Sequence, residues 1–281
     1  MAYGAKNSLL CPECRRLISA DEPVCPYCGL SKPGSPLKKL LALAFSEGSV
    51  DPVRIILIAN VVFFILSLLL NPYRMGFSGN PLNFLSPSND SVFLLGATGT
   101  IPIGSYGRWW TLLSASFLHG GILHIFFNMM ALHQLGPFVV QEFGSSRFTA
   151  IYILAGVGGF LLSYLAGIPF TLGASASICG LIGAVIYYGK SRGGSYGAAI
   201  YKQAMGWIVG LVIFGLLMPA INNWAHGGGL AAGIILGFLL GYNDKHQEGV
   251  YHRFLAFACV LATAAALIWA AGQAAILILF K

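Results

Sequence analysis

Long apolar runs separated by short polar stretches dominate the chain from residue 55 onward. Most of these runs approach or exceed the length that a helix needs to cross a bilayer. Two of them hold only about 15 residues, but they are rich in the Gly and Ala that line helix contacts inside membranes. The pattern predicts an all-α polytopic membrane protein with seven transmembrane helices, at 55–70, 112–135, 148–167, 174–188, 204–218, 225–241 and 254–280.

The composition supports a membrane protein. Hydrophobic residues make up 57% of the 281 residues and charged residues only 9%, with a mean hydropathy of +0.76. A soluble domain of this length is much less apolar. We therefore expect the lipid bilayer to be the solvent for most of the chain.

The basic residues indicate an orientation, because Lys and Arg accumulate in cytoplasmic loops. With the N-terminus inside, only Arg74, Arg108 and Lys281 fall outside. This topology accounts for the formal net charge of +7, so no nucleic-acid partner is expected. The inner face then receives Lys6, Arg15, Arg16, Lys32, Lys38, Lys39, Arg54, Arg147, Lys190, Arg192, Lys202, Lys245 and Arg253.

Two C-x-x-C knuckles lie near the N-terminus, where no apolar run typical of a secretory signal peptide is found. They are Cys11-Pro12-Glu13-Cys14 and Cys25-Pro26-Tyr27-Cys28. Four thiolates at this spacing predict one structural, non-catalytic Zn ion that supplies folding free energy to a small module. Two disulfides, which a cytoplasmic placement disfavours, and a rubredoxin-type iron site are the alternatives.

The predicted domains follow from these segments. A zinc-ribbon-like module at 1–33 precedes a linker at 34–53, in which 40–45 is mostly apolar and predicts a short interfacial helix. A six-helix core at 54–243 and a C-terminal seventh helix at 244–281 follow. The long segment 71–110 between the first two spans is rich in Pro and Gly but also apolar, which predicts packing against the membrane surface.

Small residues recur every fourth position in two of the predicted spans. Ala176, Gly180 and Ala184 follow Ser175 in one span, and Gly229, Gly233, Gly237 and Gly241 follow His226 in the other. Such stripes share one helical face and let two backbones approach closely. Ser175 and His226 would then project from neighbouring helix ends, within reach of a hydrogen bond.

A lone serine in such a helix would most simply bond to a carbonyl of the preceding turn. A histidine within a membrane span is rarer than a serine there, and it is a candidate functional residue that is expected to have a partner. Ser175 is that candidate partner, and a serine activated by a base is a nucleophile.

The span at 112–135 adds His119, His124 and Asn128 in its outer half. His124 and Asn128 are four residues apart and so lie on one face. Both can donate hydrogen bonds to the oxyanion that forms when a serine attacks an amide carbonyl.

The chain resembles the rhomboid intramembrane serine proteases over about 110–241. The segment from Phe117 to Asn128 is similar to the family's H-x-x-x-N span, Gly173-Ala174-Ser175 to its G-x-S, and Ala225-His226-x-Gly228-Gly229 with Gly233 to its A-H-x-G-G-x-x-x-G. The resemblance implies Ser175 as nucleophile and His226 as general base and then acid. It also implies an oxyanion pocket from the Ser175 backbone amide, His124 and Asn128.

Several positions depart from the family pattern. The glycine expected after the serine is Ala176, and an aromatic residue expected to pack on the histidine is Cys179. The outer-loop W-R pair reads Trp110-Thr111, with Arg108 nearby, and the expected glutamate is shifted to Glu142. No carboxylate is placed to complete a triad, so a Ser-His dyad is predicted.

The expected substrates are single-span membrane proteins, cleaved near the outer membrane face where the helix is weakened by Gly, Pro or polar residues. The expected location is a bacterial plasma membrane, with the C-terminus outside and an unidentified cytoplasmic partner for the zinc module as a further possibility. The alternatives are a catalytically silent rhomboid-like protein that binds transmembrane segments for quality control, and a proton-relaying transporter, for which no inverted repeat is evident.

Overall fold

The computed structural model describes residues 8–11, 16–27, 29–35, 51–71, 76–77, 84–217 and 221–279. It divides into two compact units, Met1–Val50 and Asp51–Lys281. The predicted interfacial helix at 40–45 lies outside the described residues.

The first unit contains a small antiparallel hairpin. Its strands β1 (Ser8–Leu10) and β2 (Leu17–Ser19) pair with Leu9 opposite Ile18. Cys11, Ile18 and Cys25 form its small buried core. A core of this size buries little apolar surface, so the unit needs another source of folding free energy.

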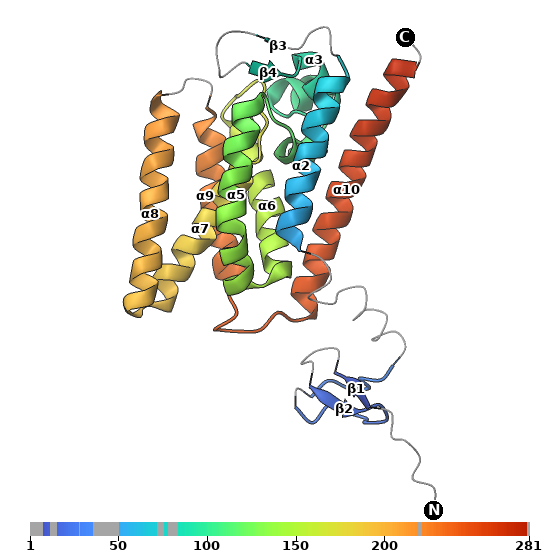
Figure 1. Cartoon of the computed structure of the whole chain (residues 1–281), viewed down its shortest axis with the longest axis vertical. Coiled ribbons are helices and arrows are strands. Elements are labelled where there is room, and N and C mark those ends of the chain that lie inside the picture. The colour runs from blue at the N-terminus through green and yellow to red at the C-terminus, as the bar shows by residue number, and fades with distance from the viewer. Residues whose placement is uncertain are drawn as a thin grey trace, which may run out of the picture. The chain divides into compact units, whose positions relative to one another are not determined.

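The second unit is a helical bundle (Figure 1). Its long helices are α2 (Pro52–Leu69), α5 (Ile122–Phe143), α6 (Ser145–Leu165), α7 (Ser175–Arg192), α8 (Gly194–Leu217), α9 (Asn223–Leu240) and α10 (Val250–Leu279). Between α2 and α5 lie shorter elements: the hairpin strands β3 (Gly76–Phe77) and β4 (Phe84–Ser86), α3 (Asn89–Leu94), a π-helical turn (Ile101–Ser105), α4 (Thr111–Ser114) and a 3₁₀ turn (Ala115–Phe117).

Helix α7 lies at the centre of this bundle, since twelve of its eighteen residues are buried. It packs most extensively against α9, and α9 packs in turn against α6. Helix α8 contacts mainly α7, and α10 packs on α6, so these two helices lie at opposite edges in Figure 1. The helix that begins with Ser175 is therefore surrounded by the helices that must position it.

Local signals in the sequence set the helix boundaries. Asp51 caps α2 by accepting a hydrogen bond from the Val53 N–H, and Pro52 occupies the first turn, where no N–H is required. Gly144 separates α5 from α6 with a φ of +93°. A Cβ at Gly144 would also overlap the Glu248 carboxylate, so only glycine fits this corner.

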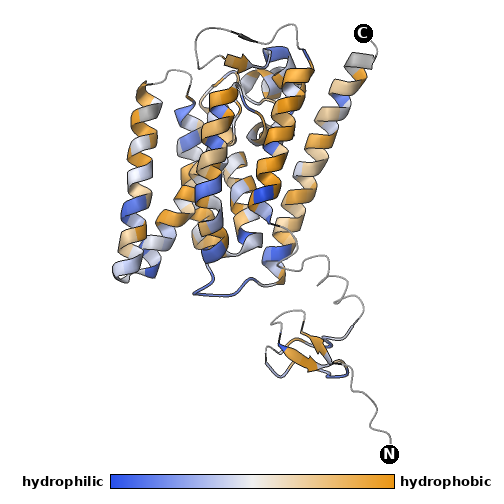
Figure 2. Ribbon diagram, viewed as in Figure 1, coloured by the Kyte–Doolittle hydropathy of each residue, from blue (hydrophilic) through white to orange (hydrophobic). Residues whose placement is uncertain are grey.

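Among the described residues, six helices are long and apolar enough to span a membrane: α2, α5, α6, α8, α9 and α10. Figure 2 shows apolar residues along these helices and polar residues in the loop between α9 and α10. The fourth predicted span corresponds to α7, which is less apolar because its last turn carries Lys190 and Arg192. A seventh span therefore remains a prediction.

Two predicted boundaries were wrong. The span expected at 112–135 is broken into α4, a 3₁₀ turn and α5, so His119 lies in the loop before α5 rather than in a span. The span expected at 204–218 begins ten residues earlier, at Gly194. Its first turn is rich in Gly and polar residues, which hid the helix from a hydropathy pattern.

Candidate active site

Ser175 and His226 meet at one end of the bundle. The Nε2 atom of His226 lies 2.8 Å from the Ser175 Oγ, although the two residues are 51 positions apart. Ser175 is the first residue of α7, and His226 lies in the first turn of α9. This is the separation at which an imidazole can take a proton from a hydroxyl.

The glycine stripe of α9 makes this meeting possible. A Cβ on Gly229 would overlap the carbonyl of Ala176, and a Cβ on Gly233 would overlap the backbone of Gly180. Gly237 lies against Ala184 in the same way, with slightly more room. Gly241, the fourth residue of the predicted stripe, instead ends α9 with a φ of +68°.

Asn222 fixes the start of α9, and with it His226. Its side-chain oxygen accepts from the Ala225 N–H at 3.1 Å, which caps the helix. Its amide nitrogen donates to the Ser163 Oγ at 2.6 Å and to the Thr171 Oγ1 at 2.9 Å. Asn222 therefore ties α9 to the end of α6 and to the loop that leads into Ser175.

Sequence reasoning missed Asn222, although a signal was present. Asparagine directly before a helix is among the strongest N-cap residues. The span was predicted to start at Ala225, two residues after α9 begins, and this removed Asn222 from consideration.

His124 lies beside the turn that presents Ser175. Gly173 has a φ of +128°, and a Cβ there would come within 2.8 Å of the His124 Nε2. The His124 Nδ1 accepts from the Gly120 N–H at 3.3 Å, so in a neutral ring Nε2 carries the hydrogen. This N–H donor is directed toward the segment between Gly173 and Ser175.

Asn128 lies one turn further along α5 and is buried. One of its amide hydrogens is donated to the His124 carbonyl at 2.8 Å, within its own helix. The other amide hydrogen is left for a further acceptor. Its predicted contact with an oxyanion remains a prediction.

His119 is fully buried behind His124, and the two rings meet edge to face at 5.0 Å. Neither ring nitrogen of His119 has a partner among the described residues. Among the described residues, no hydrogen bond joins His226 to a carboxylate either. The geometry is that of a dyad rather than a triad.

These site residues lie within a segment that matches a known protein family. Residues 106–243, which contain His124, Asn128, Ser175 and His226, match the Rhomboid domain family. The chain contains a Rhomboid domain.

Similar proteins include members from a plant and a bacterium. The chain is 32% identical over 246 residues to RHOMBOID-like protein 4 of Arabidopsis thaliana, covering 76% of this chain and 61% of the relative. RHOMBOID-like protein 5 of the same plant is 32% identical over 209 residues, 63% of this chain and 66% of the relative. Rhomboid protease GluP of Bacillus subtilis (strain 168) is 33% identical over 160 residues, 57% of this chain and 31% of the relative. The chain thus spans less than two thirds of the length of these proteins.

Two departures from the rhomboid pattern fit into the packing. Ala176 is fully buried and packs with Ala115, Phe160 and Ala225, so its methyl group fills space between helices. Cys179 is also buried, one turn below Ser175. Neither substitution separates Ser175 from His226.

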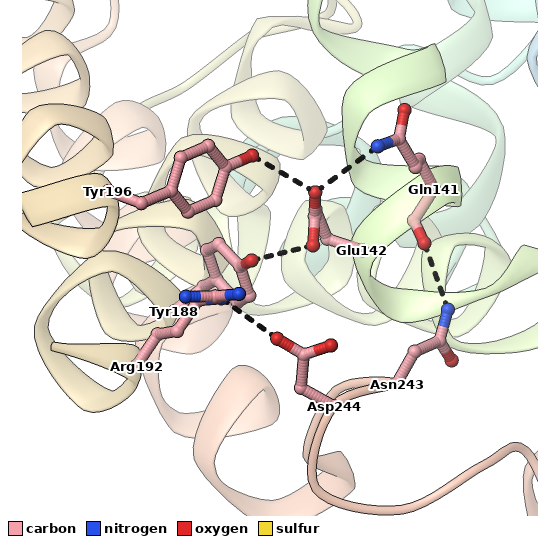
Figure 3. Close-up of polar contacts among 7 residues, drawn as sticks. All are labelled: Gln141, Glu142, Tyr188, Arg192, Tyr196, Asn243 and Asp244. Atoms are coloured by element: carbon pink, nitrogen blue, oxygen red, sulfur yellow. Dashed lines mark hydrogen bonds and ion pairs between the residues drawn. The ribbon is translucent and has the colours of Figure 1, made fainter. Parts of the chain in front are cut away.

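The shifted glutamate, Glu142, lies in a polar cluster (Figure 3). The cluster includes Arg192 at the end of α7, which is the opposite end of this helix from Ser175. Its carboxylate accepts from the Tyr188 hydroxyl at 2.6 Å and from the Tyr196 hydroxyl at 3.2 Å. Nearby, Arg192 of α7 forms an ion pair with Asp244 at 2.8 Å. Glu142 thereby joins the ends of α5, α7 and α8.

Arg147, a residue to which sequence reasoning gave only an orientation role, is fully buried close to this cluster. Its guanidinium donates to the Phe143 carbonyl, the Asn243 side chain and the carbonyls of His246 and Gln247, at 2.7 to 3.3 Å. Its backbone N–H donates to Glu248 at 2.7 Å. These hydrogen bonds attach the loop before α10 to the first turn of α6.

The N-terminal unit places two of the four predicted zinc ligands. Cys11 and Cys25 are both buried at 1% exposure and share the small core of the hairpin. The Cys11 N–H donates to the Arg16 carbonyl at 2.9 Å, and the Gly29 N–H donates to the Cys25 carbonyl at 3.0 Å. Cys14 and Cys28 lie outside the described residues, among which no group of three potential metal ligands occurs.

Proposed function

We propose that this protein is an intramembrane serine endopeptidase that acts through a Ser175–His226 dyad. The observation that carries the proposal is the 2.8 Å separation between the His226 Nε2 and the Ser175 Oγ. Its relationship to rhomboid protease GluP supports proteolysis as the activity.

The proposed first step is acylation of the serine. With Nε2 unprotonated, His226 accepts the Ser175 hydroxyl proton as Oγ attacks the carbonyl carbon of the substrate amide. The C–N bond then breaks, and His226 returns the proton to the leaving amine. The serine is left as an ester of the N-terminal half of the substrate.

The second step is hydrolysis of that ester. His226 takes a proton from water, the hydroxide attacks the ester carbonyl, and the proton returns to Ser175 Oγ as the acid leaves. Both steps pass through an oxyanion. We assign its stabilisation to the Ser175 N–H, which lies at a helix N-terminus, to the His124 Nε2–H and to the second amide hydrogen of Asn128.

We propose single-span membrane proteins as substrates, cleaved near the outer membrane face in segments that unwind readily. A regular helix hides its carbonyls in its own hydrogen bonds, so Gly, Pro or polar residues near the cleavage site favour attack. We propose that the substrate segment enters laterally from the bilayer past α8, because α8 contacts mainly α7.

We further propose that Cys11, Cys14, Cys25 and Cys28 hold one structural zinc ion. The proposal is supported by the burial of Cys11 and Cys25 in one small core, because thiolates are ligands that suit a structural zinc ion. The ion supplies folding free energy to the module and has no part in hydrolysis. We retain a bacterial plasma membrane, with this module in the cytoplasm, as the proposed location.

The test compares the purified full chain with Ser175→Ala and His226→Ala on a generic single-span substrate in proteoliposomes. Both variants are expected to lose cleavage and labelling by a serine-directed fluorophosphonate. Unchanged cleavage by Ser175→Ala would refute the proposal. A wild-type chain that binds the substrate segment without cleaving it would favour the silent, quality-control alternative.

A further inference from the structure

A pocket of about 430 Å³ lies between α3 and the last third of α10. It is lined by Phe93, Leu94, Arg108, Trp269, Gln273 and Ile276. It contains none of the residues assigned to hydrolysis. It lies at the same end of the bundle as Ser175, because the segment after α3 pairs with the segment before α7 through Thr98 and Thr171.

Arg108 provides a positive charge at one wall of this pocket. Its guanidinium lies 4.6 Å from the ring centres of both Phe93 and Trp110, and it donates to the carbonyls of Phe93 and Leu94 at 2.7 and 3.1 Å. These partners are neutral. Among the described residues no carboxylate forms an ion pair with Arg108.

Three donors of the Arg108 guanidinium remain after the two carbonyl bonds, since an arginine has five. Burial lowers the pKa of Arg108, but an arginine stays protonated in proteins. The pocket therefore contains a permanent cation, half-buried beside aromatic rings, that lacks a counter-ion in the part of the chain that is described.

The opposite wall is one face of α10. Trp269, Gln273 and Ile276 follow at intervals of four and three residues and therefore share that face. Trp269 is 57% exposed and Ile276 58% exposed, which leaves large apolar surfaces open to the bilayer. The Gln273 amide makes no hydrogen bond with another described residue and offers two donors to a ligand.

We propose that this pocket binds an anionic phospholipid, with the phosphate at Arg108 and Gln273 and the acyl chains running inward along Trp269. A guanidinium matches a phosphate with paired hydrogen bonds, and Trp is typical of the depth at which headgroups begin. An apolar surface beside the Arg108 cation suits a lipid with an apolar chain and a negatively charged headgroup. The bound lipid would connect α10 to α3.

Native mass spectrometry of the purified full chain tests this site, with phosphatidylglycerol and phosphatidylcholine offered in equal amounts. The wild type is expected to retain phosphatidylglycerol about fivefold more than phosphatidylcholine. Arg108→Gln is expected to abolish this preference. The matched control is Arg54→Gln, which removes one exposed charge from α2 and should leave the preference intact.

Arg108 also holds the carbonyl end of α3, so its loss could loosen the outer elements. Gln273→Leu is therefore the second variant, because it alters only the α10 wall and should lower phosphatidylglycerol retention by a few fold. Equal retention of both lipids by the wild type, or an unchanged preference in Arg108→Gln, would overturn the proposal. The readout needs no substrate, so it is independent of the proposed proteolysis.

Discussion

Gly233 of α9 lies directly against the backbone of Gly180 of α7, so close that a Cβ on Gly233 would overlap the Gly180 carbonyl. The contact lies two turns below Ser175 and His226. It holds together the two helices that carry the dyad, and the 2.8 Å separation of the reacting atoms depends on it.

We expect Gly233→Ala to separate α7 from α9, because the methyl group would meet backbone that cannot rotate away. Overpacking of this kind costs about 1–3 kcal/mol. The measurement is the thermal midpoint in detergent together with the cleavage rate. Gly206→Ala is the control, since nothing lies within 4 Å of its Cβ position on α8. Equal midpoints for the two variants would contradict the close contact.

His124→Ala is expected to lower kcat by about 10²–10³, the usual cost of losing one oxyanion donor. KM should change little, because the oxyanion is absent from the ground state. Asn128→Ala should have a smaller effect, since one of its amide hydrogens is already used within α5. The control is His133→Ala, an exposed histidine of the same helix. A loss confined to KM would argue against the oxyanion role.

Substitutions at Asn222 should separate helix capping from positioning. Asn222→Ala removes the cap and the two bonds to Ser163 and Thr171, at an expected cap cost of about 0.5–2 kcal/mol. Asn222→Ser keeps a capping hydroxyl but is too short to make the other bonds. We expect the serine variant to recover stability, measured as the thermal midpoint, without recovering full activity. Full activity in Asn222→Ser would show that the cap alone is sufficient.

The Glu142 cluster should contribute stability through its tyrosines. Tyr188→Phe removes the hydroxyl that donates to the Glu142 carboxylate. Losing this charge-assisted hydrogen bond is expected to lower the free energy of unfolding by about 1.5–3 kcal/mol. Tyr196→Phe, with the longer bond, should cost less. Tyr201→Phe is the control on α8, because no hydrogen bond is formed by its hydroxyl among the described residues. Similar thermal midpoints for all three variants would rule out the cluster as an anchor.

Metal removal should affect the first unit alone. One zinc ion per chain is expected by elemental analysis, and both Cys11→Ala and Cys25→Ala should lose it. A strong chelator should unfold the hairpin, seen as faster amide exchange in β1 and β2, while cleavage by the rhomboid domain continues. Full zinc content in both cysteine variants would refute the assignment.

The sequence contained most of the dyad geometry. Ser175 and His226 could be paired because the small residues that follow them recur with the period of a helix. Two helices with such a face can pack closely, and this can be predicted before the fold is known. The helix boundaries were predicted less well where a helix contains polar residues, or where an apolar segment is not one continuous helix. The polar first turn of α8 was read as a loop, and the short elements around His119 were read as a continuous span.

Contacts between distant segments were beyond a single sequence. Nothing near Arg147 indicates that residues about 100 positions later surround its side chain, because the pairing depends on how α10 returns to the bundle. The N-cap signal of Asn222 was present in the sequence although it was missed. Its bonds to Ser163 and Thr171, however, depend on the path of two loops. Local signals set the ends of helices, whereas the tertiary packing chooses their partners.

The buried guanidinium of Arg147 has a practical consequence for how this protein can be shortened. The matched domain ends at residue 243, whereas carbonyls of His246 and Gln247 and the Glu248 carboxylate satisfy Arg147 and its backbone. A fragment trimmed to the domain boundary would lose these acceptors of a buried cation, and each lost hydrogen bond to a charged group costs about 1.5–3 kcal/mol. A minimal rhomboid domain of this chain must therefore include at least the loop before α10, so that Arg147 keeps its acceptors.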